Sequence, residues 1–123
     1  MKLLLLGGGV FLGRELLDAA LARGHAVTVF NRGKARRDWP AGVQVLTGDR
    51  RGDLAALERG HWDAAIDTCG YCPADVEPTA KALAGCERYL FVSSISAYAS
   101  LATPGQDESA PLASAEGIDA DAA

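Results

Sequence analysis

Basic residues are absent from residues 99–123, which contain five acids and no lysine or arginine. Residues 1–98 hold all 12 basic side chains against 11 acids, and the whole chain carries a formal charge of −4. A net negative charge argues against nucleic acid, and we see no cluster of lysine and arginine that would form a basic face. We therefore predict that nucleic acid is not the main partner.

Long apolar runs are also absent, and cysteine is scarce. The longest apolar run, residues 3–6, is far too short to span a membrane. Glycines follow it at once and no small-residue cleavage site appears, which argues against a signal peptide. Three cysteines, an odd number, suit a reducing cytosol better than a disulfide framework. These features predict a cytoplasmic protein without a membrane partner.

The composition is otherwise that of one globular domain. The chain has 123 residues, of which 49% are hydrophobic and 23% are charged. Residues 99–123 are rich in alanine and have only three large aliphatic side chains, so they bury little. We predict a folded core over residues 1–98 and a flexible acidic loop or tail over residues 99–123.

Apolar stretches alternate with segments of helical spacing along residues 1–98. We predict helices at 11–23, 54–59 and 75–84, the last capped by Asp75, and strands at 2–6, 26–30, 43–46, 64–66 and 88–92. Such alternation predicts an α/β fold, a Rossmann-type doubly wound parallel sheet of about five strands. Ligands bind such sheets beyond the carboxyl ends of the strands. The residues after each strand are therefore the candidate site.

The first strand ends in GGGVFLG, which has glycines at Gly7, Gly8 and Gly13. The spacing G-x-x-G-x-x-G fits from Gly7 to Gly13, with Val10 in place of the middle glycine. A dinucleotide-binding turn needs a tight bend, room for the pyrophosphate and a helix N-terminus that offers free N–H groups. We predict such a turn, and the alternative is a glycine-rich bend without a ligand.

Charged residues follow the second and third strands. Arg32 occupies the place where an acid commonly selects NAD, and an arginine there suits the 2′-phosphate of NADP. Asp49 offers a carboxylate to an adenine amino group. The alternatives are a solvated basic turn at Arg32 and an Asx-type turn at Asp49.

The fourth strand is followed by the spacing C-x-x-C, from Cys69 to Cys72. A C-x-x-C between a strand and a helix is the setting of a dithiol redox motif. The alternative is that both cysteines are small residues in the wall of a cofactor groove. Cys86 is the only further cysteine, and His25 and His61 lie far off in sequence, so we predict no metal site.

Serines follow the fifth strand. A hydroxyl there could hydrogen-bond a substrate carbonyl beside a nicotinamide, and the alternative is serine turn chemistry at a strand end.

Together, GGGVFLGREL, VTVFNRG, GDR, DTCGY and YLFVSSISAY resemble the N-terminal half of extended and atypical short-chain dehydrogenases/reductases. This branch includes NAD-dependent epimerases/dehydratases and isoflavone-reductase-like proteins, and the resemblance covers about residues 1–112. It implies an NAD(P)-dependent oxidoreductase or epimerase that acts on a carbonyl/alcohol carbon. By position it implies an active-site serine at Ser94 and cofactor contacts at Gly7, Gly8, Phe11, Leu12, Gly13, Arg32, Asp49, Arg50, Cys69, Gly70 and Ser93.

The resemblance also implies a catalytic Tyr-x-x-x-Lys pair, which these residues lack. Tyrosines 71, 89 and 98 are followed four residues on by Asp75, Ser93 and Ala102. We therefore expect the chain to be the truncated cofactor-binding half of an enzyme, inactive by itself, with NADP (or NAD) as cofactor. Its fifth strand would be an open edge, which predicts a homodimer.

Two other functions remain open. One is a non-catalytic NAD(P)-binding or sensor module. The other is a dithiol redox protein, which requires a lowered thiol pKa at Cys69.

Overall fold

The computed structural model describes residues 1–34 and 38–114. The predicted alternation of strands and helices is confirmed, with bounds that lie within two residues of those expected. The elements are β1 (Lys2–Leu6), α1 (Phe11–Ala22), β2 (Ala26–Asn31), β3 (Gln44–Thr47), α2 (Ala55–Glu58), β4 (Ala64–Asp67), α3 (Pro73–Ala82), β5 (Arg88–Phe91) and the 3₁₀ turn η1 (Ile95–Ala97). The predicted flexible tail lies partly outside the described residues.

The strands form one parallel sheet in the order β3-β2-β1-β4-β5, which confirms the Rossmann-type prediction. The chain builds outward from β1 to β3 and then returns to the other side of β1. In the register of the sheet, Leu5 of β1 pairs with Val29 of β2 and with Ile66 of β4. The reversal of direction lies between β1 and β4, and this is where doubly wound folds bind ligands.

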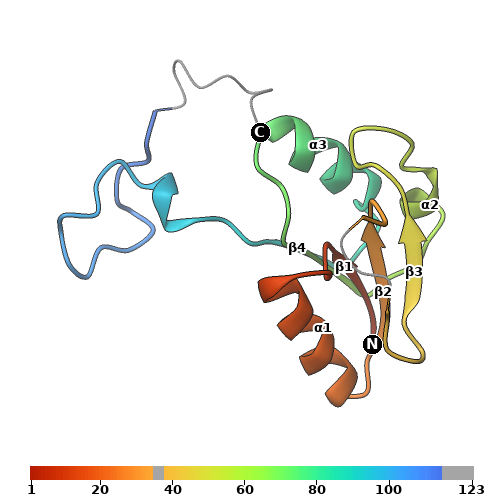
Figure 1. Ribbon diagram of the computed structural model, residues 1–123. Helices are drawn as coiled ribbons and strands as arrows, with labels where there is room; N and C mark the ends of the chain where they lie inside the picture. Colours follow the sequence, from red (N-terminus) through yellow and green to blue (C-terminus); the bar gives the residue numbers. More distant parts are fainter. Residues whose placement is uncertain (35–37, 115–123) are drawn as a thin grey trace.

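Helices cover both faces of the sheet (Figure 1). On one face, Leu3 and Leu5 pack in the cluster that contains Leu17 of α1. On the other, Leu4 and Leu6 pack in the cluster that holds Leu57 of α2, together with Leu83. Burial on both faces is why β1 is apolar at consecutive positions instead of alternating.

Among the described residues, no helix has both the length and the apolar character needed to cross a membrane.

Helix α3 begins at Pro73, so the prediction that Asp75 caps this helix is wrong. Proline suits the first helical position because its missing N–H would have no partner there. Asp75 lies in the first turn, where its Oδ2 accepts a hydrogen bond from the N–H of Tyr71 at 3.0 Å. Pro78 then falls inside the helix.

Within the described residues, β5 pairs with β4 alone and forms an edge of the sheet. Leu90 and Phe91 are exposed on it. The segment after β5 extends away from the sheet (Figure 1) and turns back on itself, where Tyr98 and Leu112 form an antiparallel bridge. The predicted open edge is therefore present.

Candidate functional site

The loops after the five strands bring the predicted site residues to one edge of the sheet. All five strands are parallel, so their carboxyl ends face the same way. Gly7 and Gly8 follow β1, Arg32 follows β2, and the residues after β3, β4 and β5 complete this edge. The structure places on it Gly7, Gly8, Phe11, Leu12, Gly13, Arg32, Asp49, Arg50, Cys69, Gly70, Ser93 and Ser94.

The glycine loop after β1 uses conformations that other residues rarely adopt. Gly7 has φ of +109° and Gly8 has φ of +82°. The N–H of Gly7 donates to the carbonyl oxygen of Phe30 at 3.0 Å, which continues the pairing of β1 with β2 one residue beyond Leu6. A Cβ on Gly7 would lie 2.4 Å from Thr68 Oγ1. Both strain and crowding therefore require glycine at the start of this loop.

Gly13 brings helix α1 against the same loop. A Cβ on Gly13 would lie 2.6 Å from the backbone nitrogen of Gly8. Val10 has φ of −144° and ψ of 158°, an extended conformation that any residue adopts, and its exposed side chain makes no capping bond. The backbone thus does not require glycine at Val10, which explains physically why this position departs from the glycine spacing.

The first residue of α1 is strained. Phe11 has φ of +45°, and its side chain is 91% exposed. A residue other than glycine in this region costs about 1–3 kcal/mol, and such strain is concentrated at binding sites. The strain therefore adds weight to the prediction that this loop binds a ligand.

The residues after β2 and β3 are tied to one another. The N–H of Gly48 donates to the carbonyl oxygen of Asn31 at 2.9 Å, and Arg32 next to it is exposed. Asp49 is also exposed, and its Oδ1 accepts from the N–H of Arg51 at 3.0 Å. The Asx-type turn considered for Asp49 is therefore present and uses one carboxylate oxygen.

Arg50 forms an internal ion pair that sequence reasoning missed. Its Nη2 donates to Asp67 Oδ2 at 2.8 Å, and the two side chains are 11% and 0% exposed. The Tyr89 hydroxyl donates to the same oxygen at 2.6 Å, and the N–H of Cys69 donates to Oδ1 at 3.1 Å. The sequence signal was a pair of opposite charges, Arg50 and Asp67, at the ends of two strands of one parallel sheet.

The charges of this cluster perturb one another. Burial by itself lowers the pKa of Arg50, but the hydrogen bond and charge of Asp67 outweigh it and leave that pKa raised. Burial and the hydrogen bond to Asp67 both raise the pKa of Tyr89. Arg50 is thus a fixed cation, and Tyr89 stays a neutral donor.

A second pair lies beside the first. Arg51 Nε donates to Asp75 Oδ1 at 2.6 Å, and Arg51 Nη2 donates to Cys72 Sγ at 3.1 Å. The Arg51 guanidinium holds the pKa of Asp75 well below its ordinary value of 3.8. Asp75 is therefore charged wherever the chain is folded near neutral pH.

This pair predicts a pH dependence of stability. Asp75 has a lower pKa in the folded chain than in the unfolded chain, so its contribution is complete well above pH 3.8 and is lost as the pH falls below that value. We expect the urea midpoint of the wild type to fall more steeply below about pH 4 than that of Asp75→Asn. Glu77→Gln is the control because Glu77 pairs with Lys81 on the exposed side of α3. Equal slopes for wild type and Asp75→Asn would contradict this assignment.

The thiols do not meet the requirement of the dithiol alternative. Cys69 and Cys72 are both free cysteines. Burial raises the pKa of the Cys69 thiol, and this effect outweighs the opposing charge of Arg50. A thiol–disulfide exchanger needs the opposite shift. Cys69 instead packs beside the apolar cluster that contains Leu57 and Leu83.

The serines after β5 are exposed and locally bonded. Ser94 Oγ accepts from the N–H of Ser96 at 3.2 Å and lies 2.7 Å from Ser96 Oγ. The turn chemistry considered as an alternative is therefore present at Ser94. Its role toward a substrate remains a prediction, as does the role of Ser93.

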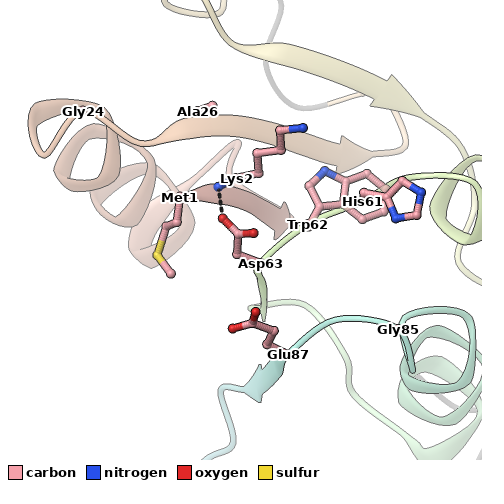
Figure 2. Close-up of a pocket in the computed structure, with 9 residues that line it drawn as sticks. All are labelled: Met1, Lys2, Gly24, Ala26, His61, Trp62, Asp63, Gly85 and Glu87. Atoms are coloured by element: carbon pink, nitrogen blue, oxygen red, sulfur yellow. Dashed lines mark hydrogen bonds between the residues drawn. The ribbon is translucent and has the colours of Figure 1, made fainter.

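A cavity lies at the opposite edge of the sheet (Figure 2). It has a volume of about 530 Å³ and opens widely to solvent. Asp63 points toward the backbone nitrogen of Lys2, whose N–H donates to Asp63 Oδ2 at 2.6 Å, while Glu87 lies farther along the same side. Because the amino ends of the strands meet here, the cavity is on the wrong edge for a Rossmann-type ligand.

Comparison with known proteins supports the same fold. No model of a known protein family matches the chain. A chloroplast stem-loop binding protein of 41 kDa from Arabidopsis thaliana is 31% identical over 113 residues, covering 79% of this chain and 30% of that protein. The enzyme WbmG of Bordetella bronchiseptica, solved with NAD and UDP, has a TM-score of 0.74 and 24% identity. UDP-glucose 4-epimerase of Bifidobacterium longum, solved with NAD⁺ and UDP, has a TM-score of 0.75 and 18% identity.

The matches to the two solved enzymes each cover 92% of this chain, but only 44% and 43% of those enzymes. The chain thus spans less than half the length of the solved structures it matches and about a third of the plant relative. The resemblance predicted from the motifs is confirmed in the fold. The chain has the Rossmann-type fold of the NAD-dependent epimerase and short-chain dehydrogenase/reductase structures and corresponds to the N-terminal part of those chains.

Proposed function

We propose that residues 1–98 bind a nicotinamide dinucleotide, with the pyrophosphate on the loop from Gly7 to Gly13. The observation that carries this proposal is the loop itself. At Gly7 and Gly13 a Cβ would collide with neighbouring atoms, and the loop leads into the N-terminus of α1 without a side-chain cap. Such a terminus attracts an anion through free N–H groups and the helix dipole.

The other strand ends complete the proposed site. Arg32 lies on the 2′-phosphate side, Asp49 and Arg50 on the adenine side, and Cys69 and Gly70 in the groove wall. Ser93 and Ser94 lie on the nicotinamide side. Two solved structures with this fold contain NAD and UDP, which supports a dinucleotide as the ligand class.

The test is direct binding. Titrating the 123-residue chain with NADPH and following the reduced nicotinamide fluorescence should give a saturable signal. Excess NADP, which lacks this fluorescence, should displace NADPH and reverse the signal. A signal that rises linearly without saturation up to millimolar NADPH would reject the proposed function.

The preference for NADP rests on Arg32. A guanidinium pairs with a 2′-phosphate through charge-assisted hydrogen bonds, each worth about 1.5–3 kcal/mol. We expect Arg32→Ala to weaken NADPH binding by about tenfold or more while NADH binding changes little. Competition titrations with both dinucleotides measure this. Equal affinity of the wild type for NADPH and NADH would remove the assignment.

The reaction class follows from the same proposal. We expect the chain to contribute the cofactor half of an oxidoreductase or epimerase that acts on a carbonyl/alcohol carbon, with Ser94 orienting the oxygen. Residues 1–123 contain no Tyr-x-x-x-Lys pair, so we expect binding by this segment without turnover. A non-catalytic NAD(P) sensor would bind in the same way.

The formal charge of −4 gives no reason to extend the stem-loop binding named for the plant relative to this chain. A cytoplasmic location stays a prediction.

We also propose that the open edge of β5 pairs with a second copy of the chain. Leu90 and Phe91 are exposed on this edge strand, and unpaired strand edges promote association. Light scattering of the 123-residue chain should give the mass of a dimer. Leu90→Lys, which places a charge on the edge, should shift it to the monomer. A monomeric wild type would reject this interface.

A further inference from the structure

Two adjacent arginines connect two loops that follow strands not adjacent in the sheet. Arg50 and Arg51 belong to the loop between β3 and α2, and their partners Asp67 and Asp75 flank the loop between β4 and α3. In the sheet, β3 and β4 are separated by β2 and β1. We call these four residues the double-arginine clamp.

The inner half of the clamp is buried. Asp67 is fully buried, and its carboxylate receives hydrogen bonds from the side chains of Arg50 and Tyr89 and from the N–H of Cys69. One carboxylate thus fixes the loop after β3, strand β5 and the loop after β4. Breaking a buried pair of this kind is costly because the remaining charge loses its partner.

Arg50 also lies close to Gly70. A Cβ on Gly70 would lie 2.9 Å from Arg50 Nη1, and this nitrogen is buried without a hydrogen-bond partner among the described residues. Arg50 therefore faces the interior of this loop cluster, where its Nη2 is held by Asp67. Asp49, next to it in the chain, is exposed.

The outer half of the clamp, Arg51 and Asp75, connects the same two loops at a position nearer to solvent. Arg51 contacts both Asp75 and Cys72, while the Asp49 carboxylate accepts from the N–H of Arg51. The clamp therefore holds Asp49 on one side and Cys69–Gly70 on the other at a fixed separation. These are the two sides between which the proposed site would receive adenine.

We propose that the double-arginine clamp is the positioning element for the adenine side of the dinucleotide site, with Arg50 acting through Asp67 and not as a direct ligand. This rests on the proposed function and gives Arg50 a different role from the cofactor contact implied by its sequence position. Preorganised loops bind more tightly because less ordering is left to the moment of binding.

The experiment measures NADPH affinity and Cys69 reactivity in the 123-residue chain. Asp67→Asn removes the charge that holds Arg50, and Glu77→Gln is the matched control because it makes the same change in the exposed pair with Lys81. Reaction of Cys69 with a disulfide reagent such as DTNB is followed as a function of pH in a Cys72→Ser/Cys86→Ser background. The labelling rate that is compared is the limiting rate of the thiolate at high pH, because removing the Asp67 charge by itself lowers the pKa of Cys69. Both readouts are taken at a temperature where circular dichroism shows every variant to be folded.

We expect Asp67→Asn to weaken NADPH binding by about tenfold and to speed Cys69 labelling by a similar factor, while Glu77→Gln changes neither. A purely structural role would lower the unfolding midpoint but leave both readouts of the folded state at wild-type values, and that result would overturn the proposal. A wild type that binds no NADPH rejects the proposed function instead. In that case the labelling rate still decides whether Asp67 fixes the loop.

Discussion

Replacing Gly13 by alanine is expected to abolish measurable NADPH binding and to lower the free energy of unfolding by about 1–3 kcal/mol. The added Cβ would lie 2.6 Å from the nitrogen and 2.9 Å from the Cα of Gly8, and neither backbone atom can move without shifting the loop. Alanine gains up to about 1 kcal/mol of helix propensity over glycine. The steric cost exceeds this gain, so the net effect is destabilising.

Gly85→Ala is the matched control for this prediction. A Cβ on Gly85 meets no atom within 4 Å, and its backbone φ is not in the left-handed region. We expect unfolding and NADPH binding both to stay at wild-type values, measured by urea denaturation and fluorescence titration. A Gly13→Ala variant that binds NADPH like Gly85→Ala would show that the loop does not hold the pyrophosphate.

Removing the Asp67 side chain is expected to have the largest effect on stability. Asp67→Ala leaves Arg50 charged and buried without its partner, which costs about 3–5 kcal/mol. A domain of this size has only about 5–15 kcal/mol of stability. We therefore expect the variant to be close to unfolding at 25 °C, measured by urea denaturation at pH 7.

A second substitution separates this charge effect from a packing defect. Arg50→Met added to Asp67→Ala removes the unpaired cation, and replacing both partners of a buried pair is far less costly than replacing one. The double variant should recover a large part of the lost stability. Equal destabilisation in the single and double variants would mean that the cavity, and not the charge, dominates.

The order of strands and helices could be predicted because it depends on local signals. Consecutive leucines before GGGVFLG indicate a strand buried on both faces, and Gly24 marks the end of α1 with a φ of +75°. The start of α3 was missed because aspartate is a common cap residue. Asp75 instead lies in the first turn of the helix and pairs with Arg51. Whether such a residue caps a helix or forms an ion pair depends on a partner that is distant in sequence.

The sequence by itself determined the parallel sheet, the edge at which the strand-end residues meet and the glycines that its tight loop needs. These follow from periodicity and from the backbone freedom of glycine, both of which are local properties. The tertiary structure alone decided that Arg50 turns inward to Asp67 and that Asp75 pairs with Arg51. Those outcomes depend on which side chains the fold brings within hydrogen-bond distance, and sequence spacing carries no record of that distance.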